Sequence, residues 1–339
     1  MTLVKSKIKT QIKITNDPSA EAQLGQLVSN DILKCGNIYI RRFDPLSILP
    51  IKEGKRVFIC AKTGAGKSQF LKNIITFIHN KIPVWKFLSP SEQGNHQYGG
   101  YFFNDLPIDF ELKDEVFKNV KTRQERVHKK WAIPNTSDPV EFKYDPGMAF
   151  ICDDISTEEK FFKDSKELAW IMTVSRNFHL LLFFLTQRYT LLPVKHRTQF
   201  SHVVMFAIDR KADITTLYSE FCSFFDNIQQ FKEVYQLCLE DNGCMIIDIN
   251  VKSMNPSDKV FYFKYIYSKY LPKVKVGSKW FQKWQKDNYD PNWDTKKQAL
   301  LQEQENIKKL ELEHKKYLKN TKLLKMAEKS KKKEIKLQE

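Results

Sequence analysis

Residues 56–71 carry the stretch that decides the fold, RVFICAKTGAGKSQFL. An apolar strand pattern at Arg56–Cys60 is followed by a glycine-rich loop and then by a helical pattern at Ser68–Asn80. The loop, Ala61–Ser68, fits the pattern A/G-x-x-x-x-G-K-S/T, and a preceding strand with a following helix is the context in which this pattern binds phosphate. The alternative interpretation is a glycine-rich turn that binds no nucleotide.

The residue types in this loop suit a nucleotide phosphate with magnesium. Gly64 and Gly66 let successive backbone N–H groups point at phosphate oxygens, and the helix N-terminus adds a partial positive charge. Lys67 is expected to reach the β- and γ-phosphates, and the Ser68 hydroxyl is expected to ligate Mg²⁺. An alanine at position 61 is tolerated if its φ is negative. The predicted nucleotide-binding residues are Ala61, Lys62, Thr63, Gly64, Ala65, Gly66, Lys67, Ser68 and Gln69.

Two further strand patterns end in polar side chains that such a site needs. Met148–Cys152 is followed by Asp153 and Asp154, which predicts one carboxylate for the magnesium and one near the attacking water, unless both only close a turn. Leu180–Thr186 is followed by Gln187, which suits a γ-phosphate sensor or a water-orienting amide. Because ligands of open α/β sheets bind at the carboxyl ends of the strands, these side chains are expected to converge on the loop.

Residues 21–267 alternate apolar runs of strand length with amphipathic stretches of helix length. This alternation predicts a three-layer α/β fold with a mainly parallel central sheet covered by helices on both faces. The other predicted strands are Val84–Leu88, Val203–Ile208, Cys244–Ile249 and Val260–Tyr265. The other predicted helices are Lys118–Trp131, Glu158–Val174 and Asp213–Leu239.

The charge is concentrated at the two ends of the chain. The 339 residues carry a net charge of +16, of which +3 lies in residues 1–20 and +10 in residues 268–339. We therefore divide the chain into a basic N-terminal arm (1–20), a P-loop ATPase domain (21–267) and a basic aromatic and helical C-terminal extension (268–339). Such a basic excess favours a polyanionic partner.

The basic and aromatic segments each leave two interpretations open. The stretch from Lys296 to Glu339 lacks Gly and Pro and is either a solvated helical tail or an arm that binds nucleic acid or a partner. The basic helix Lys118–Trp131 either faces DNA or is a solvated surface helix. The aromatic residues between Tyr270 and Trp293 either stack on bases or pack in a core or interface.

Composition excludes several classes of protein. The 25 phenylalanines and the 42% of hydrophobic residues exclude disorder of the whole chain. The longest uncharged apolar run, Leu180–Leu185, is too short to span a membrane, and the N-terminus lacks the apolar core of a secretory signal. The six cysteines form no C-x-x-C pair, which indicates a reducing compartment; a zinc site from Cys222, Cys238, Cys244 and a histidine is the alternative.

At this point the sequence resembles the FtsK–HerA superfamily, and within it the poxvirus-type genome-packaging ATPases of large DNA viruses and virophages. The resemblance rests on the phosphate loop, on the apolar strand ending in Asp153 and Asp154, and on Arg176 eleven residues before Gln187. The run Leu88–Ser91, and Leu192-Pro193 followed by Arg197, are further matches. The resemblance to this family covers roughly residues 35–267.

The resemblance implies a motor that hydrolyses ATP with Mg²⁺ and moves double-stranded DNA into a preformed capsid. It implies a homo-oligomeric ring, pentamer or hexamer, with capsid or portal-like partners, in the host cytoplasm, a viral factory or the virion. Asp154 becomes the catalytic carboxylate and Gln187 the sensor. Arg176 resembles the arginine that reaches a neighbouring subunit's nucleotide, with Arg197 as the alternative. Two other functions stay open: a DNA pump for conjugation, segregation or end processing, and a nucleotide-binding DNA scaffold that does not hydrolyse ATP.

Overall fold

The computed structural model describes residues 31–49, 53–102, 108–133, 141–155 and 159–290, together with 299, 302–303, 305–319 and 321. The predicted N-terminal arm, 1–20, lies outside the described residues, as does 322–339 of the extension. The chain divides into two compact units, Met1–Asp287 and Asn288–Glu339. In the second unit, residues 305–319 form a helix.

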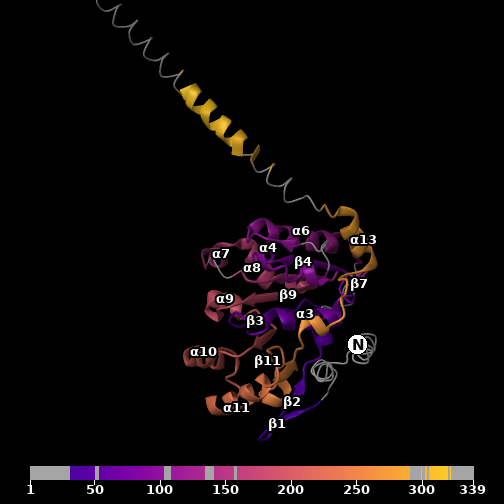
Figure 1. Cartoon of the computed structure of the whole chain (residues 1–339), viewed down its shortest axis with the longest axis vertical. Helices are drawn as coiled ribbons and strands as arrows, with labels where there is room; N and C mark the ends of the chain where they lie inside the picture. The colour runs from indigo at the N-terminus through magenta and orange to yellow at the C-terminus, as the bar shows by residue number, and fades with distance from the viewer. Residues whose placement is uncertain are drawn as a thin grey trace, which may run out of the picture. The chain divides into compact units, whose positions relative to one another are not determined.

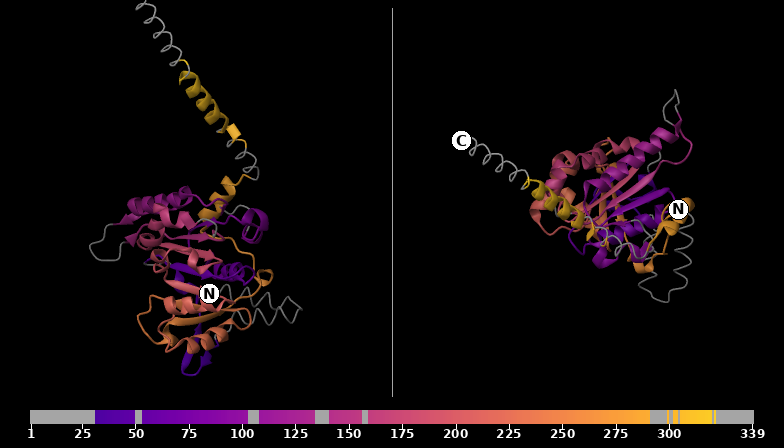
Figure 2. Two further views of the ribbon diagram at one scale, coloured as in Figure 1. Left: turned by 90° about the vertical axis from the view of Figure 1, so that its left-hand side faces the viewer. Right: turned by 90° about the horizontal axis from the view of Figure 1, so that it is seen from above.

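A ten-stranded mixed sheet forms the centre of the first unit, in the order β1-β2-β12-β11-β10-β3-β9-β8-β4-β5. In Figure 1 the labelled strands β4, β9, β3, β11, β2 and β1 follow one another down the picture, and Figure 2 shows the sheet from two further directions. The bounds are β1 Leu33–Cys35, β2 Ile38–Arg42, β3 Arg56–Cys60, β4 Val84–Leu88, β5 Ile108–Asp109, β8 Met148–Cys152, β9 Leu180–Thr186, β10 His202–Met205, β11 Gly243–Asp248 and β12 Val260–Lys264. A separate short ribbon pairs β6 (Ala132–Ile133) with β7 (Glu141–Phe142).

The six strands from β10 to β5 run parallel, which places all their carboxyl ends at one edge of the sheet. The strand that precedes the phosphate loop, β3, lies between β10 and β9, and β8 lies beyond β9. The strand that ends at Gln187 is therefore inserted between the strand of the phosphate loop and the strand of the two aspartates. Among the described strands of this sheet, only β11 and β1 are antiparallel to all the strands they pair with.

Helices cover both faces of the sheet and complete three layers. The side chains of β9 alternate: Phe183 packs with α3 (Lys67–Ile78) in one hydrophobic cluster, and Phe184 packs in a second cluster on the opposite face. The second cluster includes residues from α6 (Asp114–Trp131), α7 (Glu159–Asp164), α8 (Lys166–Thr173), α10 (Lys211–Phe221) and α11 (Ile228–Leu239). Each fully buried leucine or phenylalanine stabilises the fold by about 2 kcal/mol. The predicted three-layer α/β P-loop NTPase fold is confirmed.

Two predicted helices are each divided in the structure. The predicted helix 158–174 is interrupted at Ser165, whose hydroxyl accepts the Leu168 N–H at 3.0 Å and begins α8. The predicted helix 213–239 is interrupted after α10, and the Asn227 side chain accepts the Gln230 N–H at 2.9 Å to begin α11. These residues favour the helix N-cap because their side chains satisfy backbone N–H groups there.

Residues 268–287 belong to the first unit and pack into its core. Leu271, Val274, Val276 and Phe281 are all buried in the cluster that contains α3. Helix α13 (Lys279–Asn288) follows the short helix η4 (Ser268–Tyr270). The boundary between the compact units therefore falls after Asp287, twenty residues beyond the change in composition at 267/268. No helix among the described residues has the length and apolar composition needed to cross a membrane.

Candidate nucleotide site

The loop between β3 and α3 needs glycine at two positions. Gly64 has a φ of 80° and Gly66 a φ of 100°, a conformation that side chains with a Cβ rarely adopt. A Cβ on Gly66 would also lie 2.0 Å from the hydroxyl of Tyr265, which donates to the Ala65 carbonyl oxygen at 3.2 Å. Gly66 is the N-cap of α3, so the loop presents the N-terminus of this helix. Ala61 is not among the described residues with positive φ, as its place in the pattern requires.

Lys67 lies between the loop and the two aspartates. Its Nζ donates a hydrogen bond to the Ala61 carbonyl oxygen at 2.9 Å, and the side chain is half-buried. Burial lowers the pKa of Lys67, while the charges of Asp153 and Asp154 raise it. The position suits a cation that binds phosphate at the loop.

Asp153 is the buried member of the acidic pair. It follows β8, is 5% exposed, and donates its backbone N–H to the Leu88 carbonyl oxygen at 2.9 Å. Burial raises the pKa of the Asp153 carboxyl, while a hydrogen bond from Tyr98 and the charge of Lys67 lower it. Tyr98 donates its phenolic proton to Oδ2 of Asp153 at 2.6 Å.

Asp154 is turned toward the neighbouring strand. Its φ of 56° is the left-handed conformation, which aspartate tolerates better than most residues. Gln187 at the end of β9 donates from Nε2 to Oδ1 of Asp154 at 2.9 Å. The structure thus brings together Asp154 and Gln187, the two side chains that are predicted to act on the attacking water.

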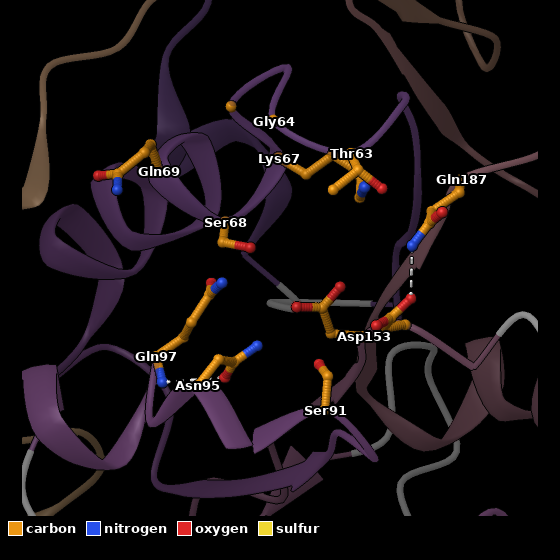
Figure 3. A pocket seen from close by; sticks show the side chains of 12 residues that line it. Thr63, Gly64, Lys67, Ser68, Gln69, Ser91, Asn95, Gln97, Asp153 and Gln187 are labelled. Carbon is orange, nitrogen blue, oxygen red and sulfur yellow. Dashed lines mark hydrogen bonds between the residues drawn. The ribbon is translucent and has the colours of Figure 1, made fainter. Parts of the chain in front are cut away.

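The carboxyl ends of β3, β4, β8 and β9 meet around one pocket (Figure 3). On one side lies the phosphate loop and on the other the segment that follows β4. The lining residues are Thr63, Gly64, Gly66, Lys67, Ser68, Gln69, Ser91, Asn95, Gln97, Asp153, Asp154 and Gln187. The sequence-predicted side chains that should converge here, Ser68, Asp153 and Gln187, therefore do so.

Two of the predicted loop residues also bind other parts of the chain. Lys62 is exposed and forms an ion pair with Asp209. The Gln69 side chain lines the pocket and accepts the Ser268 N–H at Oε1, at 2.7 Å. Gln69 thereby connects the phosphate loop to the segment after β12.

The polar groups of the pocket fit magnesium that arrives with a nucleotide. Mg²⁺ prefers oxygen ligands and is usually held by one or two protein groups, waters and substrate phosphates. The Ser68 hydroxyl and the Asp153 carboxylate supply such a set. Among the described residues, no group of three or more His, Cys, Asp or Glu side chains could hold a metal without other ligands.

Arg176 lies at the opposite edge of the sheet. It belongs to η2 (Ser175–Phe178), before β9 begins, and its carbonyl oxygen accepts the Gly54 N–H at 2.6 Å where β3 begins. Its exposed side chain pairs with Glu53, Nε to Oε2, at 3.3 Å. The seven residues of β9 separate it from Gln187 by about 23 Å. Within one chain, Arg176 is therefore not part of the pocket.

Arg197 is buried and fully engaged inside its own chain. It is 8% exposed, and its Nε and Nη2 donate to the two carboxylate oxygens of Glu220 at 3.1 and 2.8 Å. Nη1 donates to the Leu192 carbonyl oxygen at 2.8 Å, and the guanidinium lies over the Tyr189 ring. This geometry favours a structural role and leaves Arg176 as the better candidate for action on a neighbouring subunit.

Sequence reasoning missed the wall of the pocket formed by Ser91, Asn95 and Gln97. These residues lie in and around the short helix α4 (Glu92–Asn95) and face Ser68 and Asp153 across the pocket in Figure 3. A signal was present for Ser91, because it lies three residues after a predicted strand, Val84–Leu88, at the edge where ligands bind. The motif Leu88–Ser91 noted in the sequence includes Ser91 but neither Asn95 nor Gln97.

Proteins of viral origin are similar to this chain in sequence. Protein L437 of Acanthamoeba polyphaga mimivirus is 26% identical over 251 residues, which is 74% of this chain and 85% of that protein. Protein 075L of Invertebrate iridescent virus 6 is 24% identical over 232 residues, 66% of this chain and 85% of that protein. Among solved structures, the genome packaging NTPase B204 from Sulfolobus turreted icosahedral virus 2, in complex with AMPPCP, aligns with a TM-score of 0.45 and 15% identity, over 62% of this chain and 98% of that one.

The family model described as Poxvirus A32 protein matches residues 42–235, which include the phosphate loop, both aspartates and Gln187. This match covers more than half of the chain. The resemblance to poxvirus-type proteins noted from the motifs is thereby confirmed. The chain belongs to the poxvirus A32 protein family.

Proposed function

We propose that this protein is an ATPase that packages a viral genome, moving double-stranded DNA into a preformed capsid. One observation carries the ATPase part of the proposal: Lys67, Ser68, Asp153, Asp154 and Gln187 line one pocket at the carboxyl ends of neighbouring parallel strands. Membership of the poxvirus A32 family and the viral relatives support the packaging part.

Each side chain has a place in phosphoryl transfer to water. The loop N–H groups and Lys67 bind the phosphates of ATP, and Ser68 and Asp153 hold the magnesium, which neutralises charge on the phosphate oxygens. Asp154 accepts the proton of the attacking water, and the hydrogen bond from Gln187 fixes the direction of its carboxylate. Catalysis then rests on positioning and on charge stabilisation.

Arg176 acts on the nucleotide of a neighbouring subunit in a homo-oligomeric ring, a pentamer or hexamer. Its place at the far edge of the sheet supports this, because the exposed guanidinium cannot reach the pocket of its own chain. An arginine supplied in trans stabilises the transition state and makes hydrolysis depend on assembly of the ring.

The basic ends of the chain supply non-specific affinity for DNA. Residues 1–20 form an arm, residues 21–267 the ATPase domain and residues 268–339 an extension, and +13 of the net charge of +16 lies outside the ATPase domain. Neutralising phosphates releases counterions, so DNA affinity should fall as salt rises. Capsid or portal-like components are the other partners, in the host cytoplasm, the viral factory or the virion.

Phosphate release from ATP, measured with and without double-stranded DNA, tests the proposal. We expect hydrolysis that DNA stimulates, and we expect Lys67→Ala to abolish it because the phosphates lose their cation. The exposed Lys81→Ala is the matched control and should hydrolyse ATP like the wild type. Undiminished turnover in Lys67→Ala would overturn the site, and a wild type that binds ATP and DNA without hydrolysis would point to a scaffold.

Mixing two inactive variants tests the role of Arg176. A Lys67→Ala subunit keeps its arginine, and an Arg176→Ala subunit keeps its nucleotide site. If the arginine acts in trans, mixed rings contain pairs in which both parts are intact, so mixing should restore part of the activity. Arg41→Ala, which removes another exposed arginine, should be active alone. If the mixture hydrolyses ATP no faster than the separate variants do, Arg176 does not act in trans.

A further inference from the structure

A buried tyrosine contacts both residues that are assigned to magnesium. Tyr98 is 0% exposed and donates its phenolic proton to Oδ2 of Asp153 at 2.6 Å. Burial raises the pKa of Tyr98 well above its usual value, the charge of Asp153 raises it further, and a hydrogen bond with Ser68 lowers it. The hydroxyl therefore stays protonated at neutral pH and lies beside both Ser68 and Asp153. Sequence reasoning assigned no role to Tyr98.

The hydrogen bond fixes one of the two carboxylate oxygens of Asp153. Oδ2 accepts the bond from Tyr98, and the backbone N–H of Asp154 donates a further hydrogen bond to the same carboxylate. Side-chain torsions of aspartate next to the carboxylate are broad and roughly two-fold, so these hydrogen bonds restrict its rotation. Partners of metal-ligating groups commonly hold the ligands in orientation in this way.

Tyr98 is itself held firmly in place. The buried Glu92 carboxylate accepts the Tyr98 N–H at 2.9 Å and the Gly99 N–H at 2.8 Å, which fixes the backbone at the tyrosine. The Tyr98 ring is stacked on Phe102, at 6.5 Å between centroids, and lies against Phe87. The hydroxyl therefore has a defined position before any ligand binds.

A buried lysine completes the network. Lys72 of α3 is 6% exposed, and burial lowers its pKa while the charges of Glu92 and Asp153 raise it. The carboxylates of Glu92 and Asp153 are thus attracted to the charge of Lys72 on α3. Tyr98 donates a hydrogen bond to each of them, from its backbone N–H and from its hydroxyl. The segment after β4 carries this tyrosine together with Asn95 and Gln97 of the pocket wall.

We propose that Tyr98 is a positioning residue for the magnesium site, which orients Asp153 through its phenolic hydroxyl. This inference rests on the proposed function, since it assumes that Ser68 and Asp153 hold magnesium with the nucleotide. Tyr98 does not touch the reacting atoms. Its removal should weaken the contribution of magnesium to nucleotide binding and leave magnesium-free binding unchanged.

The test is Tyr98→Phe, which keeps the ring and its contacts with Phe87 and Phe102 and removes only the hydroxyl. Binding of a fluorescent, non-hydrolysable ATP analogue is measured in EDTA and over a magnesium titration. Magnesium should increase the affinity for the analogue. We expect the magnesium concentration that gives half of this increase to rise by about 10- to 100-fold in Tyr98→Phe, the usual effect of losing a partner of a metal ligand. The affinity in EDTA should stay at the wild-type value.

Tyr235→Phe is the matched control. Tyr235 is also a buried tyrosine, and its hydroxyl donates to the Phe206 carbonyl oxygen, so this variant loses a buried phenolic hydroxyl away from the pocket. Both variants should lose melting temperature to a similar extent, while only Tyr98→Phe should change the magnesium titration. Equal magnesium titrations for Tyr98→Phe and the wild type would overturn the inference.

A double-mutant cycle with Asp153→Ala separates orientation from general damage. If Tyr98 acts through Asp153, adding Tyr98→Phe to Asp153→Ala should change the magnesium titration no further. Additive effects, or loss of affinity in EDTA, would show a structural role only and overturn the inference. A wild type whose nucleotide binding ignores magnesium would instead contradict the proposed function.

Discussion

The contact between Gln187 and Asp154 joins two strands at the point where hydrolysis is proposed to occur. Gln187→Ala removes the side-chain amide that donates a hydrogen bond to the Asp154 carboxylate and fixes its direction. We expect kcat to fall by about 100-fold, which is the lower end of the contribution that general acid–base catalysis makes to enzyme rates. The KM for ATP should be nearly unchanged. Steady-state kinetics measure both values, and the exposed Gln229→Ala serves as control. A rise in KM with unchanged kcat would assign Gln187 to binding instead.

We expect His202 to make the stability of the fold depend on pH. It is 2% exposed on β10, and its Nδ1 lies 3.0 Å from the Ser201 hydroxyl. Burial lowers the pKa of His202 to about 4, with Asp248 raising it and Lys55 lowering it. The unfolded chain has the ordinary pKa near 6.5 and binds a proton first as pH falls. Stability should therefore be lost between pH 6.5 and about 4, and should not change through this group above pH 6.5.

The melting temperature at pH 7 and pH 5, compared between the wild type and His202→Asn, measures this effect. The amide of asparagine keeps a donor toward Ser201 and does not titrate. We expect the wild type to lose more melting temperature at pH 5 than His202→Asn does. His314→Gln, an exposed histidine of the second unit, should behave like the wild type. An equal loss in His202→Asn would place the acid sensitivity elsewhere.

Most residues of the candidate site could be predicted from the sequence because they follow buried strands directly. Asp153 and Gln187 each stand directly after an apolar run, and the phosphate-loop pattern identifies Lys67. Parallel strands bring such positions together. Tyr98 could not be predicted, because it lies ten residues after the last residue of β4 and only the turn through Glu92 brings it back to Asp153. The roles of Arg176 and Arg197 were likewise distinguished only by their surroundings.

At the scale of the element, the start of β3 depends on a glycine next to β9. A Cβ on Gly54 would lie 2.2 Å from the Leu180 carbonyl oxygen, which belongs to backbone and cannot move away easily. Gly54→Ala should therefore lower the free energy of unfolding by about 2 kcal/mol, as overpacking does. Denaturant unfolding measures the change.

Gly94→Ala is the control for this substitution. A Cβ on Gly94 meets nothing within 4 Å, so this variant should unfold like the wild type. Because the Gly54 N–H also donates to the Arg176 carbonyl oxygen, Gly54→Ala should disturb the backbone that carries the proposed trans arginine. Full stability in Gly54→Ala would mean that the two strands can separate at this point without cost.

The elements that the sequence predicts best are the strands of the parallel centre. β3, β4, β8 and β9 begin and end at the predicted residues. β3, β8 and β9 are buried along their whole length, and in β4 only Lys86 interrupts the apolar run. Helix boundaries were less predictable, since the amphipathic pattern continues through Ser165 and through Asn227. The edge strand β1 and its neighbour β2 were missed because they are short and partly exposed.

At the scale of the molecule, the point of truncation should decide whether the first unit stays folded. A chain of residues 1–267 loses Leu271, Val274, Val276 and Phe281 from the core, each of which contributes about 2 kcal/mol. We expect it to melt far below the full chain or to aggregate, while residues 1–287 should melt like the full chain. Thermal unfolding of the three chains checks this, and equal melting temperatures would show that residues 268–287 are dispensable.

The truncation at 287 also separates folding from DNA binding. It removes fourteen basic and nine acidic side chains but no buried residue of the first unit. Its DNA affinity should therefore be weaker and should depend less steeply on salt than that of the full chain.

Arg176 and the phosphate loop lie at opposite edges of one sheet, and this constrains any assembly that uses both. An isologous contact made through one of these edges alone would bring two arginines or two pockets together and leave both sites incomplete. A head-to-tail contact joins one edge to the other, and repeating it closes a cycle or extends a filament. A closed cycle leaves no unused arginine and no uncompleted pocket, whereas every open chain of subunits has one of each at its ends.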